Sequence, residues 1–182
     1  FIRRCTVQWM GDAGREEYLP LLVQQMLYDP SKRISFRGKT AMEKIGLSKA
    51  HEYHIAAIDS MPDITSKEKL EKILTRSAER SKEWLNDDLI PTVLNDTLSI
   101  KKRISSVRTF RNYRFQDALP TLIGVAGDSQ QPEQLRVAVL EALGWFTMSV
   151  NRDTIVAACQ DIIDRSAAPD AVQQEALKTK RR

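Results

Sequence analysis

The amino-acid sequence predicts an all-α fold, a right-handed α-α superhelix of about five helical hairpins. A pattern of Leu-Pro, then Asp, then Arg and a final Gly occurs in full around Pro20 and around Pro120, and a weaker copy lies around Pro91. Apolar residues recur three or four positions apart along most of the chain, which is typical of helices. No alternating stretch is long enough for a strand, so we expect helices joined by short turns.

The composition is that of an ordinary globular chain and argues against several classes of protein. Of 182 residues, 42% are hydrophobic and 29% are charged, and the seven Gly and seven Pro are too few for a disordered or collagen-like chain. No apolar run approaches the roughly 18 residues of a membrane span, so we expect no membrane insertion. The net charge of +4 is compatible with an anionic partner without requiring one.

Cys5 and Cys159 are expected to be free thiols, because they lie near opposite ends of an elongated array and a disulfide needs Cα atoms within about 7 Å. No paired cysteine motif indicates zinc. Free thiols favour the cytoplasm without excluding the periplasm, so the compartment stays open. The chain begins with Phe1 rather than Met, and we expect it to be part of a longer one.

The first part of the chain is divided by its Pro and Gly residues. Pro20 falls in the first turn of a predicted helix, where its missing N–H costs little, and Pro30 follows the end of that helix. Gly11 and Gly46 are expected to close the helices that precede them. The predicted helices here are 1–10 (the second helix of an incomplete hairpin), 16–28 and 32–45.

Residues 47–82 depart from the pattern but have the length of a hairpin. A helix is expected over 50–60, followed by a turn around Pro62. Thr65 or Ser66 is expected to cap the second helix of this hairpin. The apolar stripe of that second helix consists of Leu70, Ile73, Leu74 and Ala78.

The second half of the chain shows the pattern again. Helices are predicted over 83–98, 100–112, 116–126 and 133–148. A further helix is expected to begin after a cap at Asn151 or Asp153, and the last helix runs from Ala171 to the end. The helix over 133–148 is apolar almost all round, so we expect it to be buried, with Leu140 and Leu143 in the core. The predicted repeats are 1–11 (partial), 14–46, 47–82, 83–112, 115–148 and 152–182, together one domain over 1–182.

These landmarks resemble the HEAT repeat, especially the short HEAT-like form also found in phycobilin lyases. The Asp and Arg of that pattern match at Asp29 and Arg37, at Asp96 and Arg103, and at Asp128 and Arg136, and its closing Gly matches at Gly11, Gly46 and Gly144. Arg111 replaces this Gly in the third copy, and the last hairpin has no Arg within 171–174, where we expect the series of pairs to stop. The resemblance covers roughly half of the chain and implies a scaffolding solenoid.

The paired charges are expected to stabilise turns rather than to act on a ligand. Asp128 is predicted to bond either Arg136 or turn amides, and Asp29 to do the same near Arg37. Such charge-assisted hydrogen bonds satisfy backbone groups that a turn leaves without partners.

Few residues suggest chemistry. His51 and His54 lie one helical turn apart, but a metal site needs three or four ligands, and the sequence His-Glu-Tyr-His lacks the spacing of a zinc-protease helix. No Gly-rich phosphate loop and no nucleophile elbow occur. We therefore expect no metal, no cofactor and no catalysis.

The helix over 100–112 carries the densest positive charge. Its buried stripe is predicted to consist of Ile100, Ile104, Val107 and Phe110. Lys101 and Lys102 then face outward, with Arg108 at the border. The resemblance implies that second helices line the inner face of the array, so Lys101, Lys102, Arg108 and Arg114 are the candidate partner-binding residues. The alternative is a solvated face whose basic side chains cover apolar surface.

The sequence therefore favours a non-catalytic scaffold for protein–protein interaction, with an acidic partner as the natural ligand of the basic helix. The alternative is a HEAT-like solenoid that binds nucleic acid on a basic inner surface. DNA glycosylases with HEAT-like repeats do so with a groove of aromatic and basic residues, whereas Trp9, Trp84 and Trp145 are scattered over different hairpins here. A lyase function would follow from the phycobilin-lyase resemblance alone, and no residue supports it.

Overall fold

The computed structural model describes residues 1–61, 63, 67–68, 70, 80–165 and 168–182. These residues are helical apart from short connections, and no strand occurs among them, which confirms the all-α prediction. They form two compact units, Phe1–Trp84 and Leu85–Arg182. No helix in the described ranges has the length and apolarity needed to cross a bilayer.

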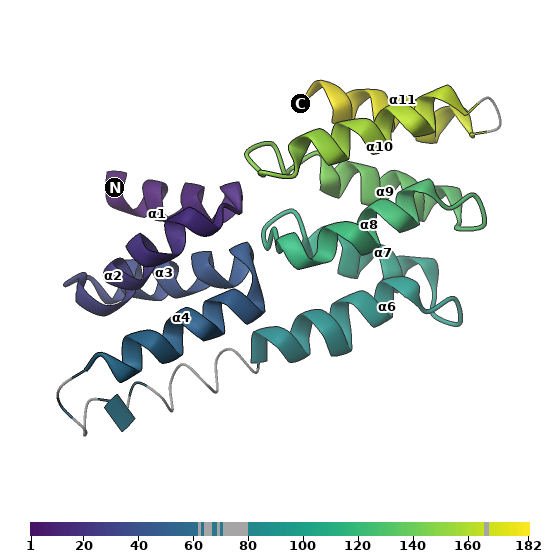
Figure 1. Ribbon diagram of the computed structural model, residues 1–182. Coiled ribbons are helices and arrows are strands. Elements are labelled where there is room, and N and C mark those ends of the chain that lie inside the picture. The colour runs from purple at the N-terminus through teal and green to yellow at the C-terminus, as the bar shows by residue number, and fades with distance from the viewer. Residues whose placement is uncertain (62, 64–66, 69, 71–79, 166–167) are drawn as a thin grey trace. The chain divides into compact units, whose positions relative to one another are not determined.

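The first unit consists of helices α1 (Ile2–Ala13), α2 (Leu19–Tyr28), α3 (Lys32–Ile45) and α4 (Leu47–Asp59), with a 3₁₀ turn over Glu16–Tyr18. Helix α3 is central, because α1, α2 and α4 all pack against it (Figure 1). Pro20 lies in the first turn of α2, as predicted, and the helix ends where Asp29 turns extended before Pro30. The predicted second helix of the 47–82 hairpin, with Ile73, Leu74 and Ala78, falls mainly outside the described residues.

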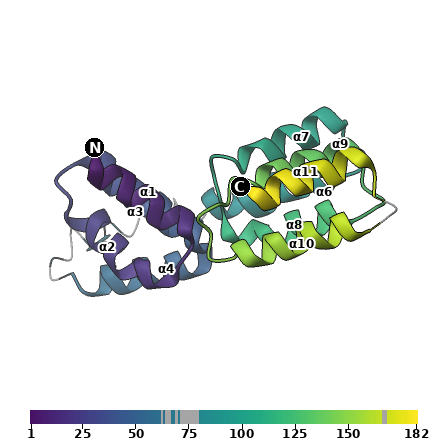
Figure 2. The same ribbon diagram turned by 90° about the horizontal axis from the view of Figure 1, so that it is seen from above.

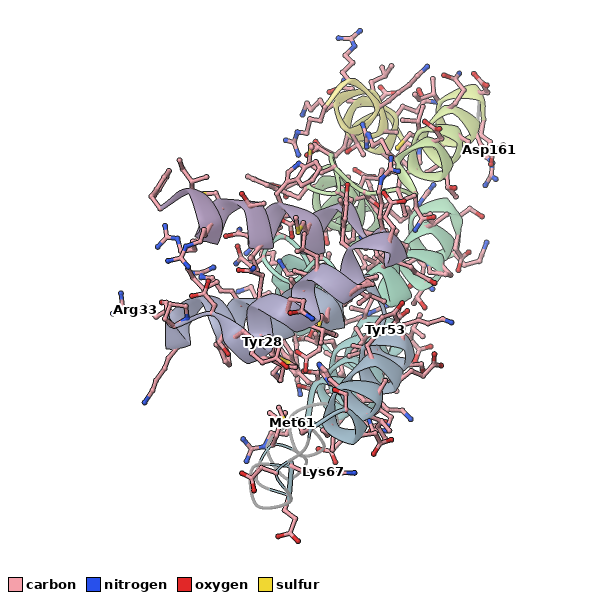
Figure 3. All side chains as sticks on the ribbon, turned by 60° about the vertical axis from the view of Figure 1, so that its left-hand side comes forward. Tyr28, Arg33, Tyr53, Met61, Lys67 and Asp161 are labelled. Carbon is pink, nitrogen blue, oxygen red and sulfur yellow. The ribbon has the colours of Figure 1, made fainter. Side chains whose placement is uncertain are left out.

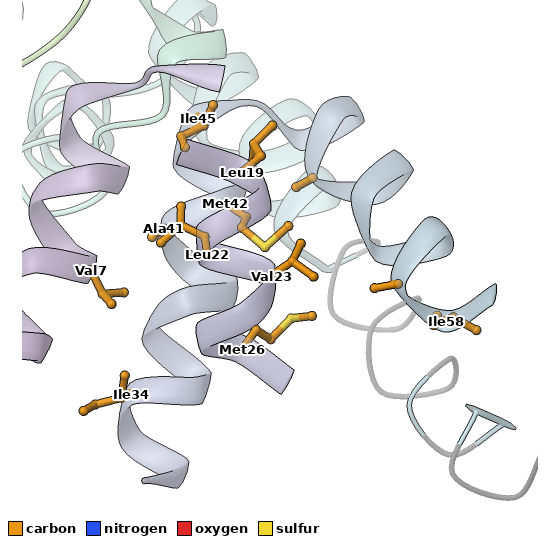
Figure 4. Packing of buried hydrophobic residues seen from close by; sticks show 12 residues of the cluster. Val7, Leu19, Leu22, Val23, Met26, Ile34, Ala41, Met42, Ile45 and Ile58 are labelled. Carbon is orange, nitrogen blue, oxygen red and sulfur yellow. The ribbon is translucent and has the colours of Figure 1, made fainter. Parts of the chain in front are cut away.

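A cluster of aliphatic side chains from these helices forms the core of the first unit (Figure 4). Leu19, Leu22 and Met42 are almost completely buried where α2 packs on α3. The other members are Val7, Val23, Met26, Ile34, Ala41, Ile45, Ala50, Ala57 and Ile58. The three-to-four-residue spacing in α2 therefore marks the face that is buried, as the sequence predicts.

The prediction that Gly11 closes the first helix is wrong. Helix α1 continues to Ala13, and Gly14 follows it with φ 70°, the left-handed conformation that favours glycine at a helix end. Gly11 lies inside the helix and is buried. A Cβ atom at Gly11 would lie 2.7 Å from the Cα atom of Ala41, so the missing side chain allows α1 to approach α3 closely.

The other two closing glycines stand at helix ends without the left-handed conformation. Gly46 ends α3 and begins α4 with φ 173°, which is extended backbone. Gly144 follows α9 (Glu133–Leu143) with φ −61°. A Cβ atom at Gly144 would lie 2.7 Å from Nη1 of Arg182, so this glycine makes room for a neighbouring side chain.

The second unit contains three hairpins in sequence. Their helices are α6 (Ile90–Leu94) and α7 (Ile100–Thr109), α8 (Leu119–Gly127) and α9, and α10 (Arg152–Asp164) and α11 (Asp170–Arg181). A π-helical stretch, Trp84–Leu89, leads into α6, and a 3₁₀ turn, Gln116–Ala118, leads into α8. The second helices α7, α9 and α11 lie next to one another in that order, and α8 lies next to α10 (Figures 1 and 2).

The most apolar predicted helix is shorter than expected. Helix α9 ends at Leu143 rather than near Met148, and its Leu140 and Leu143 are buried as predicted. Phe146 beyond the helix is also buried, whereas Trp145 is 46% exposed. The indole therefore belongs to the connection after α9 and not to the core.

Candidate interaction site

Three hairpins turn from their first to their second helix with the same local structure. The side-chain oxygen Oδ1 of one residue accepts a hydrogen bond from the backbone N–H two residues later. The three bonds are Ser31 N to Asp29 at 2.8 Å, Thr97 N to Asn95 at 3.0 Å, and Gln130 N to Asp128 at 2.9 Å. Asp, Asn and Ser favour turns because their side chains can replace a backbone acceptor in this way. The bond from Gln130, with a further one from Gln131, lowers the pKa of Asp128.

This shared geometry corrects one assignment in the sequence pattern. The turn residue of the third copy is Asn95, and Asp96 is its exposed neighbour. The Arg of the pattern, Arg103, then stands eight residues after the turn residue, as Arg136 stands eight after Asp128. The sequence pattern has Asp at this position and so indicates Asp96, although the amide oxygen of Asn accepts the same bond.

The arginines of the pattern bond the end of the first helix and not the turn residue. Arg103 donates from Nε to the carbonyl oxygen of Val93 over 2.8 Å, and Arg136 donates in the same way to Ala126 over 2.9 Å. Both residues are only 3% exposed. Burial is the main reason that the pKa of Arg136 is lowered. Asp128 binds turn amides, which was one of the two predicted outcomes.

The first hairpin departs from this arrangement. Asp29 accepts from the turn amide of Ser31, one of its two predicted outcomes, and its ion pair is formed with Arg3 of α1 at 2.7 Å and not with Arg37. Arg37 instead donates to Oε1 of Gln8 over 3.3 Å.

In the last hairpin, Gln173 occupies the Arg position and donates to the carbonyl oxygen of Arg165 over 3.1 Å. The series of arginines therefore stops there, as predicted.

The histidines of α4 lie in a polar patch of the first unit. His54 is 1% exposed, and neither ring nitrogen has a hydrogen-bond partner among the described residues. Burial lowers the pKa of His54 to about 4, with smaller contributions from Lys39 and His51. Lys39 pairs with Glu43 at 2.9 Å, and the pKa of Glu43 is raised mainly by burial. In the described part of the chain, no three His, Cys, Asp or Glu side chains gather around a possible metal position.

The basic helix α7 contains cations of two kinds. Lys101, Lys102 and Arg108 are exposed, and none has an ion pair or hydrogen bond through its side chain to a described residue. Arg103 between them is buried and bonded to Val93 and to Gln131. The apolar stripe beneath is confirmed, since Val107 and Phe110 are fully buried and Ile100 and Ile104 partly so.

The fourth candidate residue, Arg114, lies in the connection after α7 and has a structural contact. Its Nε donates to the carbonyl oxygen of Trp145 over 2.9 Å. Arg111 forms an ion pair with Glu141 of α9. The structure therefore separates the four predicted residues into three exposed cations on α7 and one arginine that joins two connections.

The connections after α7 and α9 each contain an exposed aromatic residue, of which the sequence places Tyr113 at the end of the basic helix but puts Trp145 inside the buried helix over 133–148. Tyr113 is 40% exposed and Trp145 is 46% exposed. An apolar residue beyond the end of a helix is a signal for an exposed contact residue. The sequence does not give this signal for Trp145, because it predicts that the helix continues to 148, whereas α9 ends at Leu143.

Comparisons of the chain with family models, with curated proteins and with solved structures find no match. The function of the chain is therefore inferred from its own geometry.

Proposed function

We propose that this chain is a non-catalytic interaction module of HEAT-like repeats, arranged as a right-handed superhelix, that binds an acidic partner protein through α7. The observation that carries this proposal is the division of α7 into buried and exposed cations. Arg103 is buried and bonds the carbonyl oxygen of Val93, while Lys101, Lys102 and Arg108 are exposed to solvent.

The repeated turn supports the repeat reading. Asn95 and Asp128 make the same turn bond, and Arg103 and Arg136 bond the same carbonyl position of the preceding helix. A hairpin of this length cannot bury its apolar face alone, so such hairpins stabilise one another by stacking. Proteins of this construction act mostly as surfaces for partners.

The exposed charges support an anionic partner. Lys101 and Arg108 are seven residues apart and so lie on the same side of α7, with Lys102 beside them. Long-range attraction to an acidic surface increases the rate of association and weakens as salt screens it. The same three cations suit a phosphate backbone, which is the alternative, and a gel shift with duplex and single-stranded DNA at several salt concentrations separates the two.

The proposal is tested by reversing Lys101 and Lys102 to Glu and comparing the proteins that the purified chain captures from a lysate. Captured proteins should be lost from the variant and lost from the wild type as salt rises. Lys32 and Arg33 provide a matched control, since they are also an adjacent exposed pair in the first turn of a second helix, and Arg33 extends outward from α3 (Figure 3). Unchanged capture by the α7 variant would mean that this face is only solvated.

A further inference from the structure

Helix α1 has two apolar sides, and only one of them is covered. Val7 and Gly11 lie on the side that packs against α3, and both are buried. Ile2, Cys5 and Trp9 follow one another at three and four residues, which places them together on the opposite side of the helix. Ile2 is 78% exposed, Trp9 is 43% exposed, and Cys5 is exposed as well. We call these three residues the outer face of α1.

Helix α11 of the second unit provides a contrast, because its outer side is polar. Thr179 donates to the carbonyl oxygen of Leu140 over 2.7 Å, so the side of α11 that carries Thr179 faces α9. The opposite side presents Gln174, Lys178 and Arg181, which are all exposed. A repeat at the end of an array needs such a polar outer side to be soluble. The uncharged outer face of α1 is instead typical of a helix that packs against another helix.

The charged residues of α1 do not contribute to its outer face. Arg3 pairs with Asp29 at 2.7 Å, and Asp12 pairs with Lys44 at 2.7 Å. Arg4 stands three and seven residues before the two buried residues of the helix and so lies on the other side. A charged peptide or a phosphate backbone would find no counter-charge on this face. The face suits an uncharged, apolar helix.

The outer face of α1 is also complementary to itself. Large side chains stand at its two ends, and the smaller side chains of Cys5 and Thr6 lie in the middle. When two copies of α1 cross antiparallel, Ile2 of one copy meets Trp9 of the other at both ends, and the smaller residues let the backbones approach at the centre. The ring of Trp9 lies 5.8 Å from that of Tyr18, which restrains the indole, so little side-chain freedom is lost on contact.

We propose that the outer face of α1 binds the same face of a second copy of this chain, in a symmetric antiparallel helix pair. Helix α1 has 12 residues and is about 18 Å long, so one such pair buries less than the roughly 1,200–2,000 Å² of a stable dimer. The dimer is therefore weak and forms at micromolar to millimolar concentration. The contact does not involve α7, so it is independent of the proposed function.

Sedimentation velocity of the purified chain across that concentration range measures the equilibrium between monomer and dimer. The wild type should shift from monomer to dimer at high as well as at low salt, because the contact is apolar. Ile2→Glu and Trp9→Glu should each weaken dimerisation by at least about tenfold, since symmetry places each substitution in the contact twice.

Phe36→Glu is the matched control, because Phe36 is an apolar side chain with 65% exposure that lies on α3 instead. This variant should dimerise like the wild type. Amide spectra report whether each variant is folded, and Ile2→Glu lies in the exposed first turn of α1, so the two substitutions on the outer face check each other.

Cys5 provides an independent measurement, because the symmetric pair brings the two Cys5 thiols together at its centre. A short bis-maleimide, which adds one thiolate at each end, should join two chains through Cys5. Cys159 is buried, so its thiol reacts slowly. A chain with Cys5→Ser and Gln174→Cys carries its exposed thiol on α11 and should be joined at least about tenfold more slowly.

The inference is overturned if the chain stays monomeric at millimolar concentration, if both Glu variants of the outer face dimerise like the wild type, or if the thiol on α11 is joined as fast as Cys5. Association that high salt abolishes would also overturn it, because charged surfaces would then be responsible. The variant Lys101→Glu with Lys102→Glu should keep the dimer, and a dimer lost in this variant would show association through α7 instead.

Discussion

Arg136 donates its Nε–H to the carbonyl oxygen of Ala126 across 2.9 Å, and this bond closes the turn between α8 and α9. Arg103 repeats it one hairpin earlier with Val93. Since Arg136 is buried, replacing it with Met leaves the carbonyl of Ala126 without its donor. We expect a loss of about 1–3 kcal/mol in the free energy of unfolding of the second unit, measured by denaturant titration or by hydrogen exchange.

Arg37 is the matched control for that substitution, because it stands at the same place in the first hairpin but is partly exposed and bonds only Gln8 among the described residues. Arg37→Met should cost less than half as much. Equal losses at the two positions would contradict a special role for the bond to the carbonyl.

Leu140 and Leu143 lie fully buried in α9, so truncation of either side chain leaves a cavity. Leu140→Ala or Leu143→Ala should lower the free energy of unfolding of the second unit by about 2–5 kcal/mol. Leu177 of α11, which is 37% exposed, provides the comparison and should cost clearly less. A loss below about 1 kcal/mol at both buried positions would show that α9 is not central to the core.

Gly11→Ala should destabilise the first unit, because the added Cβ would lie 2.7 Å from the Cα atom of Ala41 and backbone cannot move aside cheaply. We expect a loss of about 1–3 kcal/mol by hydrogen exchange at the core amides of α3. Gly124 is the opposite case, since it lies in α8 and a Cβ there has no atom within 4 Å. Gly124→Ala should be neutral or stabilising by up to about 1 kcal/mol, because Ala is the better helix former.

Acidification should destabilise the first unit through His54. Its pKa in the fold is about 4, so between the ordinary value of 6.5 and 4 the unfolded chain takes up a proton that the folded chain does not. The free energy of unfolding should therefore fall by about 1.4 kcal/mol per pH unit across that range, about 2–4 kcal/mol in all. Protein without this histidine should lack that slope.

The slope is measured as the difference between the wild type and His54→Leu, because Glu43 acts in the other direction. The pKa of Glu43 is raised in the fold, so its contribution to stability is lost as the pH rises from 4.5 through the folded value. Taking the difference removes this contribution. His51→Gln serves as control and should keep the slope, since His51 is exposed. A difference that stays constant from pH 7 to pH 4 would contradict the assignment.

The helices could be predicted from the sequence because apolar spacing and the Pro residues act locally. Pro20 and Pro120 both stand in the first turn of a first helix, as the pattern indicates. Gly11 was misread because a glycine that ends a helix and one that lets two helices approach look alike in sequence. Only the position of Ala41 on another helix distinguishes the two cases.

The candidate site was partly predictable for the same reason. Helical spacing places Lys101 and Lys102 outward, and they are exposed. Spacing says nothing about what lies beyond the helix end, so it did not predict that Arg114 bonds Trp145 or that the indole is exposed. These depend on contacts between connections about thirty residues apart, which no local rule describes.

The central claim is that neighbouring cations of α7 have different roles, and measuring stability and binding on the same variants tests it most directly. Arg103→Met should lower the free energy of unfolding of the second unit by about 1–3 kcal/mol. It should leave capture of an acidic partner unchanged at temperatures where the variant is folded. Lys101→Glu with Lys102→Glu should change stability by no more than about 0.5 kcal/mol and abolish capture. The claim is contradicted if both variants still capture the partner, or if both lose capture to the same degree.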